Sequence, residues 1–155
     1  MDNYKKNICI VGASGLLGSN VLKEALARGY KVNGTVRDVN APDKATFLNA
    51  LPNADQNLRL FEAEMADSES FDDALSNVDC VFIACLIPVY KGPTGKPARE
   101  MDDEQGYEEI IMPTVNGCLN ILKSTARQGV KNVVICSSTS STNPVPPVPI
   151  KNEVD

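Results

Sequence analysis

Hydrophobic and polar positions alternate between two kinds of pattern along the 155-residue chain. Short apolar runs rich in β-branched residues predict strands, and segments with apolar residues three and four positions apart predict amphipathic helices. The predicted strands cover residues 7–11, 31–36, 58–63, 78–84 and 131–136. Helical spacing appears between them, so the chain reads as a regular strand–helix alternation.

The predicted helices differ in how clearly their ends are marked. The first begins at Leu16 and ends at Arg28-Gly29, because glycine favours a helix stop. Further helices are predicted at 45–51, ended by Pro52, at 68–75, capped by Asp67 or Ser68, and at about 104–128. Pro113 lies inside the last helix and is expected to kink it or change its direction.

This alternation predicts an α/β fold: a doubly wound parallel sheet (Rossmann fold) in strand order 3-2-1-4-5. The near-continuous apolar runs VFIA and NVVIC are typical of strands covered on both faces. We expect one domain over residues 1–138. Residues 139–155 are rich in proline and serine, lack periodicity and are expected to form a loop or tail.

Composition narrows the class of protein further. Hydrophobic residues make up 43% and charged residues 23%, as in ordinary globular domains, and the net charge of −5 argues against nucleic-acid binding. The apolar run at 80–89 is too short to cross a membrane, and no signal-peptide pattern opens the chain. Five dispersed cysteines favour reduced thiols in the cytoplasm. The absence of histidine excludes His-based triads, and no metal site is predicted.

A glycine motif, GASGLLG, follows the first predicted strand and opens the first helix. In this setting Gly12 permits a tight turn, Gly15 lets backbone amides approach a pyrophosphate, and Gly18 lets helix and strand pack closely. The motif therefore predicts a dinucleotide site. The alternative is a glycine-rich turn that binds nothing.

The end of the second predicted strand indicates which dinucleotide would bind. NAD sites usually carry an acidic residue there, but this chain has Arg37, nineteen residues after Gly18. A guanidinium suits a 2′-phosphate, Lys44 could reach the same group, and Ser14 could add a hydroxyl. Asp38 should then point away from the site. We therefore predict NADP(H) rather than NAD(H), the alternative being that Arg37 is simply a solvated surface residue.

Three stretches carry a resemblance to a known family: VGASGLLGSNVLKEALARGYKVNGTVRD, LRLFEAEMADSESFDDALSNVDCVFIAC and PTVNGCLNILKSTARQGVKNVVICSS. In order and spacing the chain resembles the extended short-chain dehydrogenase/reductases, in the branch of the dihydroflavonol and cinnamoyl-CoA reductases. The resemblance implies an NADPH-binding Rossmann domain of an oxidoreductase that reduces ketones, aldehydes or CoA thioesters.

The resemblance also implies roles for individual residues. Arg37 and Lys44 would hold the 2′-phosphate, and Glu64 and Met65 would flank the adenine. Asn116 would lie near the active site, and Ser138 would be the catalytic serine that binds the substrate carbonyl. The pyrophosphate turn would be formed by Gly12, Ser14, Gly15, Leu16 and Leu17, and the nicotinamide-side ribose would be lined by Ala84, Cys85 and Leu86.

The family's catalytic Tyr-x-x-x-Lys pair has no counterpart in this sequence. Ile8, Gly34, Thr94 and Ile111 stand four residues after the four tyrosines. The family continues with a Tyr-Lys helix and a substrate lobe, so the chain reads as truncated before them and as inactive alone. Without that pair, a serine in a tract such as SSTSST, where Ser138 lies, is more often just a polar loop residue than a catalytic one, and Asn116 can simply be satisfied by backbone.

Three functional hypotheses remain open at this point. The chain is the cofactor-binding part of a reductase, a non-catalytic NADP(H)-binding regulator, or an interaction module without nucleotide. Lacking the family's next helix and strand, it should expose the edge of strand 132–136 and an apolar face above the fourth and fifth strands. We therefore expect a homodimer or a protein partner on that edge, or a tail that folds back over it.

Overall fold

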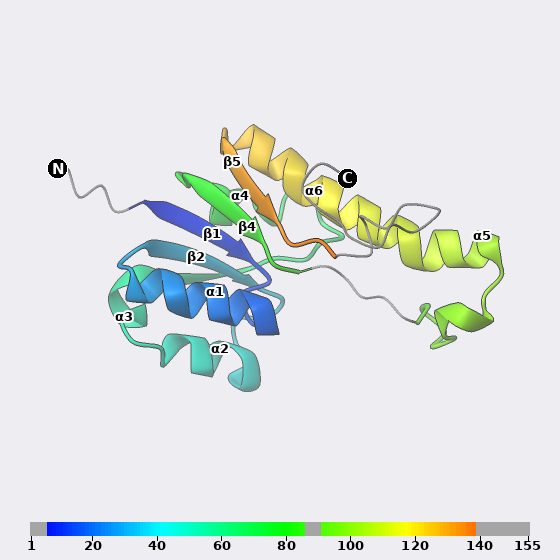
Figure 1. The fold of residues 1–155 in the computed structure, drawn as a ribbon, viewed down its shortest axis with the longest axis horizontal. Coiled ribbons are helices and arrows are strands. Elements are labelled where there is room, and N and C mark those ends of the chain that lie inside the picture. The colour runs from blue at the N-terminus through cyan, green and yellow to red at the C-terminus, as the bar shows by residue number, and fades with distance from the viewer. Residues whose placement is uncertain (1–5, 86–90, 139–155) are drawn as a thin grey trace, which may run out of the picture.

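The computed structural model describes residues 6–85 and 91–138, which form a parallel sheet with helices on both faces (Figure 1). The sheet has five strands in the order β3-β2-β1-β4-β5, and every neighbouring pair is parallel. The strands are β1 (Asn7–Val11), β2 (Lys31–Val36), β3 (Leu58–Glu62), β4 (Cys80–Ile83) and β5 (Asn132–Ile135). The predicted fold class and strand order are confirmed. The predicted tail, 139–155, lies outside the described residues.

Helices α1 and α2 lie on one face of the sheet, and α4 and α6 lie on the other (Figure 1). The α-helices are α1 (Leu16–Ala27), α2 (Pro42–Asn49), α3 (Ala54–Asn57), α4 (Asp72–Leu75), α5 (Asp103–Gly106) and α6 (Met112–Arg127). A short 3-10 helix, η1 (Ala98–Glu100), precedes α5, and a π-helical segment, η2 (Tyr107–Ile111), joins α5 to α6.

The core consists of two clusters, one on each face of the sheet. Ile8 and Ile10 of β1 pack with Leu22 of α1, whereas Cys9 and Val11 belong to the cluster on the α6 side. This division follows from the period of two along a strand, which sends successive side chains to opposite faces. Both faces of β1 are therefore buried.

Two helix predictions need correction at their boundaries. The helix predicted at 45–51 begins earlier, at Pro42, since proline suits the first turn of a helix, and it ends at Asn49. The helix predicted at 68–75 begins only at Asp72. Asp67 accepts a hydrogen bond from the Glu69 amide, so it stabilises a turn before the helix rather than capping the helix. Helix α3 was not predicted.

The long helix predicted at about 104–128 is present as three consecutive segments, α5, η2 and α6. The π-helical turn immediately precedes Pro113, where a proline without an N–H interrupts the regular hydrogen-bond ladder. Thr114 donates its hydroxyl to the Ile110 carbonyl at 3.0 Å across this interruption. The expected irregularity at Pro113 therefore takes the form of a π turn.

The outer strand β5 is exposed on both faces, which corrects the expectation that NVVIC is covered. Val133 and Ile135 are 39% and 46% exposed on the α6 face, and Val134 is 46% exposed on the opposite face. Register pairs Val134 with Phe82 of β4, which is itself only partly buried. The exposure of β5 agrees with the expectation that this edge of the sheet is open.

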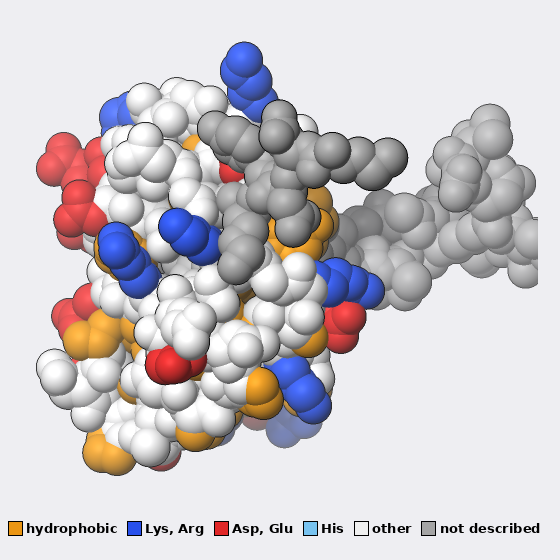
Figure 2. Space-filling model, turned by 90° about the vertical axis from the view of Figure 1, so that its left-hand side faces the viewer, with side chains coloured by type: hydrophobic (Ala, Val, Ile, Leu, Met, Phe, Trp, Pro, Cys, Tyr) orange, Lys and Arg blue, Asp and Glu red, His pale blue; other side chains and the backbone are white. Residues whose placement is uncertain are grey.

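The end of the molecule at the amino ends of the strands carries scattered charges of both signs among uncharged side chains (Figure 2). This view shows no continuous basic patch on the described residues of that face. Among the helices of the described residues, none has the length and hydropathy needed to cross a membrane.

Candidate functional site

The glycine motif forms a tight turn between β1 and α1. Gly12 has φ +81°, a conformation that side chains rarely adopt, and a Cβ there would lie 2.7 Å from the Cβ of Cys85. A Cβ on Gly18 would lie 2.1 Å from the Gly12 carbonyl oxygen. Gly12 and Gly18 therefore both allow a backbone approach that no larger residue would permit.

Thr35, at the end of β2, holds this turn in place. Its hydroxyl accepts a hydrogen bond from the Gly12 amide at 3.2 Å, and its carbonyl accepts one from the Ala13 amide at 2.9 Å. Thr35 is 2% exposed, so both bonds are shielded from water. The turn is thus built by two strands together.

The amino end of α1 is open to an anion. Gly15 is the N-cap and gives no side-chain cap, and the first turn contains no acidic residue. The amides of Leu16, Leu17 and Gly18 therefore lack the partners that a capping side chain would supply. Together with the positive end of the helix dipole, such amides suit a phosphate or pyrophosphate group.

A cavity of about 730 Å³ opens beside this turn, at the carboxyl ends of β1 to β4. From β1, the strands are added first on one side (β2, β3) and then on the other (β4, β5). The cavity lies at this switch point, between β1 and β4, which is the usual ligand position in such folds. Of the predicted binding residues, those lining it are Gly12, Ser14, Gly15, Leu16, Leu17, Arg37, Lys44, Glu64, Met65, Ala84 and Cys85. The structure thus brings together residues that the resemblance selected from four separate stretches.

Two cations at one end of the cavity are not engaged elsewhere. Arg37 and Lys44 line it, are exposed, and make no ion pair with any other described residue. The Asp38 carboxylate instead accepts a hydrogen bond from the Asn40 amide at 2.8 Å, and Asp38 does not line the cavity. Asp38 thus has the arrangement predicted for it, and both cations are available to an anionic ligand.

The cavity lining also contains Cys85, whose thiol lies 3.7 Å from the Met65 sulfur. Burial, as the largest cause, raises the pKa of Cys85 to about 11, so the thiol stays protonated at neutral pH. Cys85 therefore serves as a small packing residue rather than a nucleophile, because nucleophilic cysteines need a lowered pKa.

Other predicted site residues lie away from the cavity lining. Gly18 is buried beneath the turn, and Leu86 lies outside the described residues. Asn116 is exposed on α6, and Ser138 is exposed after β5. Neither Asn116 nor Ser138 lines the cavity, so their catalytic roles stay predictions.

Sequence reasoning missed several residues that shape the cavity. Phe71, the residue before α4, lines the cavity. Thr35 also lines the cavity, and it holds the glycine turn through its hydrogen bond to Gly12. Thr35 carried a usable signal, because a polar residue at the buried end of an apolar strand needs a hydrogen-bond partner. Phe71 carried none, since a lone aromatic residue there reads simply as core.

The sheet order, the glycine turn and the cavity at the strand ends define the class of Rossmann-type nucleotide-binding domains. Residues 12–153 match a family described as NAD(P)H-binding. The chain therefore belongs to that family, within the extended short-chain dehydrogenase/reductases related to dihydroflavonol reductases.

Its relatives are considerably longer proteins. Tetraketide alpha-pyrone reductase 1 of Arabidopsis thaliana is 39% identical over 142 residues, covering 91% of this chain and 40% of that protein. Dihydroflavonol 4-reductase of Dianthus caryophyllus is 35% identical over 138 residues, covering 89% of this chain and 35% of that protein. The chain thus spans 35–40% of their length and corresponds to their NAD(P)-binding portion.

Solved structures give the same fold. The NADPH complex of Gre2 from Candida albicans is 26% identical with a TM-score of 0.66, covering 87% of this chain and 38% of that one. Pen from Bacillus thuringiensis has a TM-score of 0.69 at 22% identity, covering 90% of this chain and 40% of that one. The second likeness shows the fold alone.

Proposed function

We propose that this chain is the NADP(H)-binding part of a carbonyl reductase. The observation that carries the proposal is the cavity at the amino end of α1, which is lined by the turn with its open amides and by Arg37 and Lys44, neither of which forms an ion pair with a described residue. A dinucleotide that bears an additional phosphate matches both features, because each anionic group meets its own donors.

Each part of the cavity suits one part of the nucleotide. The pyrophosphate would be held by the amides of the glycine turn, with the Ser14 hydroxyl beside them. Arg37 and Lys44 would hold the 2′-phosphate, and Glu64 and Met65 would flank the adenine. Ala84 and Cys85 would line the ribose on the nicotinamide side.

The reaction proposed for the whole protein is hydride transfer to a ketone, an aldehyde or a CoA thioester. NADPH supplies the hydride when bound, while a protein acid must supply the proton. Ser138 is proposed to hydrogen-bond the substrate carbonyl, and Asn116 is proposed to lie near it. The sequence has no Tyr-x-x-x-Lys pair to serve as the acid, so the chain alone is expected to bind without turnover.

Titration of the chain with NADPH, followed by nicotinamide fluorescence, tests the binding proposal. Saturable binding at micromolar concentration is expected, and no binding at millimolar NADPH would leave only an interaction module. A reductase assay with aldehydes and flavanonols then tests whether the chain that binds NADPH also turns over. A measurable rate would contradict the claim that the missing Tyr-Lys pair abolishes catalysis, and binding without turnover fits either a reductase fragment or a non-catalytic regulator.

We also propose that the β5 edge associates with another chain, either in a homodimer or with a protein partner. Val133, Val134 and Ile135 lie on the edge strand of the described sheet and are between 39% and 46% exposed, which favours association with another chain. Light scattering coupled to gel filtration tests this, and a monomer at all concentrations would contradict self-association. A cytoplasmic location is also proposed, supported by the odd number of dispersed cysteines.

A further inference from the structure

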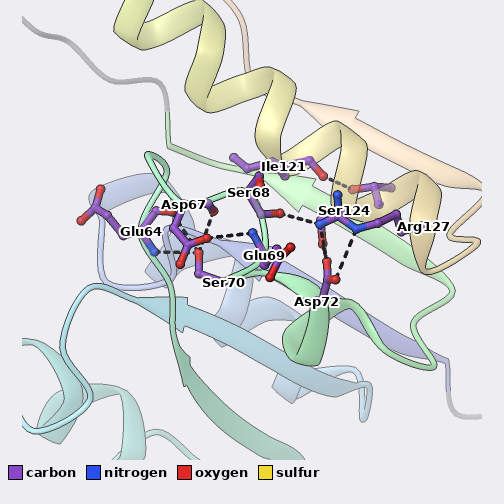
Figure 3. Close-up of polar contacts among 10 residues, drawn as sticks. Glu64, Asp67, Ser68, Glu69, Ser70, Asp72, Ile121, Ser124 and Arg127 are labelled. Carbon is purple, nitrogen blue, oxygen red and sulfur yellow. Dashed lines mark hydrogen bonds and ion pairs between the residues drawn. The ribbon is translucent and has the colours of Figure 1, made fainter.

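The segment that joins β3 to α4, residues 63–71, is an irregular loop that contributes to the cavity lining. Ala63, Glu64 and Met65 all line the cavity. The hydroxyl of Ser70 accepts a hydrogen bond from the Glu64 amide at 3.1 Å and lies 3.0 Å from the carbonyls of Glu64 and Asp67 (Figure 3). These bonds set the shape of the loop but do not attach it to the rest of the protein.

Side chains on one face of helix α6 bond to the loop and to the start of α4. Arg127 donates to the Ser68 carbonyl and forms an ion pair with Asp72 at 2.7 Å, and the Ser124 hydroxyl donates to the same carboxylate (Figure 3). These contacts hold the C-terminal part of the loop, at Ser68, and the start of α4, at Asp72. Neither Ser68 nor Asp72 lines the cavity.

At the cavity end of the loop, the Ala63 amide donates to the Val36 carbonyl at 2.9 Å. The side-chain attachment at this end comes from Asn120 of α6, one helical turn before Ser124. Its side-chain amide donates to the Met65 carbonyl at 2.9 Å and lies 3.5 Å from the Ala66 carbonyl. The Met65 amide donates within the loop, to the Glu64 carboxylate at 3.1 Å. Asn120 is therefore the polar side chain that fixes the backbone of a cavity-lining residue to α6.

We propose that Asn120 is a positioning residue of the nucleotide site, an inference that rests on the proposed function. By holding the Met65 carbonyl, it keeps Glu64 and Met65 at the wall where the adenine would lie. It does not touch the turn that would hold the pyrophosphate, which is fixed separately by Thr35. Loss of Asn120 should therefore weaken recognition of the adenine end and leave recognition of the pyrophosphate unchanged.

The test compares Asn120→Ala and the isosteric Asn120→Asp with wild type and with Asn132→Ala. Asn132 makes a matched bond, from its side-chain amide to the Asp79 carbonyl at 2.9 Å, at the other end of the sheet. Calorimetric titration gives the affinity for NADP⁺, and competition by inorganic pyrophosphate gives the affinity of the turn. Thermal unfolding shows whether each variant is folded.

Both Asn120 variants should bind NADP⁺ about three- to tenfold more weakly, the range for one net hydrogen bond, with pyrophosphate affinity unchanged. Asn132→Ala should bind both ligands as wild type does. Folded Asn120 variants with wild-type NADP⁺ affinity, or with equal losses for both ligands, would overturn the positioning role. Failure of the wild-type chain to bind NADP⁺ would instead defeat the proposed function itself.

Discussion

Strands β1 and β5 have similar apolar sequences, NICIV and NVVI, but their surroundings differ completely. In β1, Ile8, Cys9, Ile10 and Val11 are at most 6% exposed. In β5, Val133, Val134 and Ile135 are between 39% and 46% exposed. An apolar run therefore predicts a strand, but neighbouring elements determine whether the side chains of that strand are buried.

The contrast distinguishes two regions of the sheet. The candidate nucleotide-binding side, at β1, is covered by other elements, whereas the edge at β5 is exposed. The turn after β1 is fixed by β2 through Thr35, and α1 covers β1 from one side. Beyond β4, Phe82 and Val134 share a face to which the described residues contribute no covering helix. Changes on the β1 side should therefore have large effects, and changes at β5 small ones.

The largest effect is expected for Gly18→Ala. Its Cβ would overlap the Gly12 carbonyl and displace the turn, losing at least two amide contacts to phosphate, each worth about 1.5–3 kcal/mol. NADPH affinity should fall on the order of 100-fold or more in a fluorescence titration. Gly106→Ala is the matched control, because no atom lies within 4 Å of its Cβ position. Wild-type binding by Gly18→Ala would show that the close approach is dispensable.

Arg37→Ala should reduce NADPH affinity about 10- to 100-fold, the range for charge-assisted hydrogen bonds to one phosphate. NADH lacks that phosphate, so its affinity should change less than about twofold. Arg59→Ala on β3 is the control, since Arg59 is exposed and does not line the cavity. Equal losses for NADH and NADPH would contradict the assignment of Arg37 to the 2′-phosphate.

A matched pair of Val→Ala variants tests the contrast between buried and exposed strands directly. Val81 of β4 is fully buried, and Val81→Ala should cost about 2 kcal/mol in the free energy of unfolding. Val134→Ala, on the neighbouring strand, should cost less than about 0.5 kcal/mol under conditions where the chain is monomeric. Urea denaturation measures both. Similar costs would mean that something covers β5 in solution, as a dimer would.

The smallest effect concerns the Asp72–Arg127 pair, which joins α4 to α6. The Arg127 guanidinium, as the largest cause, and the Ser124 hydroxyl hold the pKa of Asp72 below its usual 3.8. A lowered pKa stabilises the fold above about pH 4, and this contribution is lost as pH falls through the folded-state pKa. The difference in Tm between wild type and Asp72→Asn should thus be constant from pH 7 to about pH 4.5 and shrink below.

The exposed Glu24–Arg28 pair is the control for this measurement. Its side chains are 57% and 65% exposed, so Glu24→Gln should change Tm less than Asp72→Asn does at pH 7. A Tm difference for Asp72→Asn that stays constant to pH 3 would show that the carboxylate charge of Asp72 does not contribute.

Much of this fold could be predicted from the sequence because its signals are local. Apolar runs located all five strands, and the GASGLLG motif located the turn, since glycine spacing and strand–helix context act within a few residues. The start of α4 could not be predicted, because Ser70 and Asp67 bond to backbone groups of the preceding loop. Whether these side chains cap the helix or bond to the loop depends on how the loop folds.

For the candidate site, the sequence selected residues that share one cavity, but their binding roles stay predictions. Arg37 and Lys44 follow from the charge pattern after β2, and the structure places them at one cavity. Asn120 was missed because its contact with Met65 spans 55 positions, and an asparagine on a helix carries no sign of its partner. Contacts between distant elements therefore required the structure.

The central claim is that the amino end of α1 and Arg37 together hold a phosphorylated dinucleotide. Amide chemical shifts of the ¹⁵N-labelled chain, followed during titration with NADP⁺, test it most directly. The account predicts saturable shifts at Ser14 to Gly18 and at Arg37, with none at Asn132–Ile135. Unchanged amides in the turn, or shifts confined to the β5 edge, would contradict it.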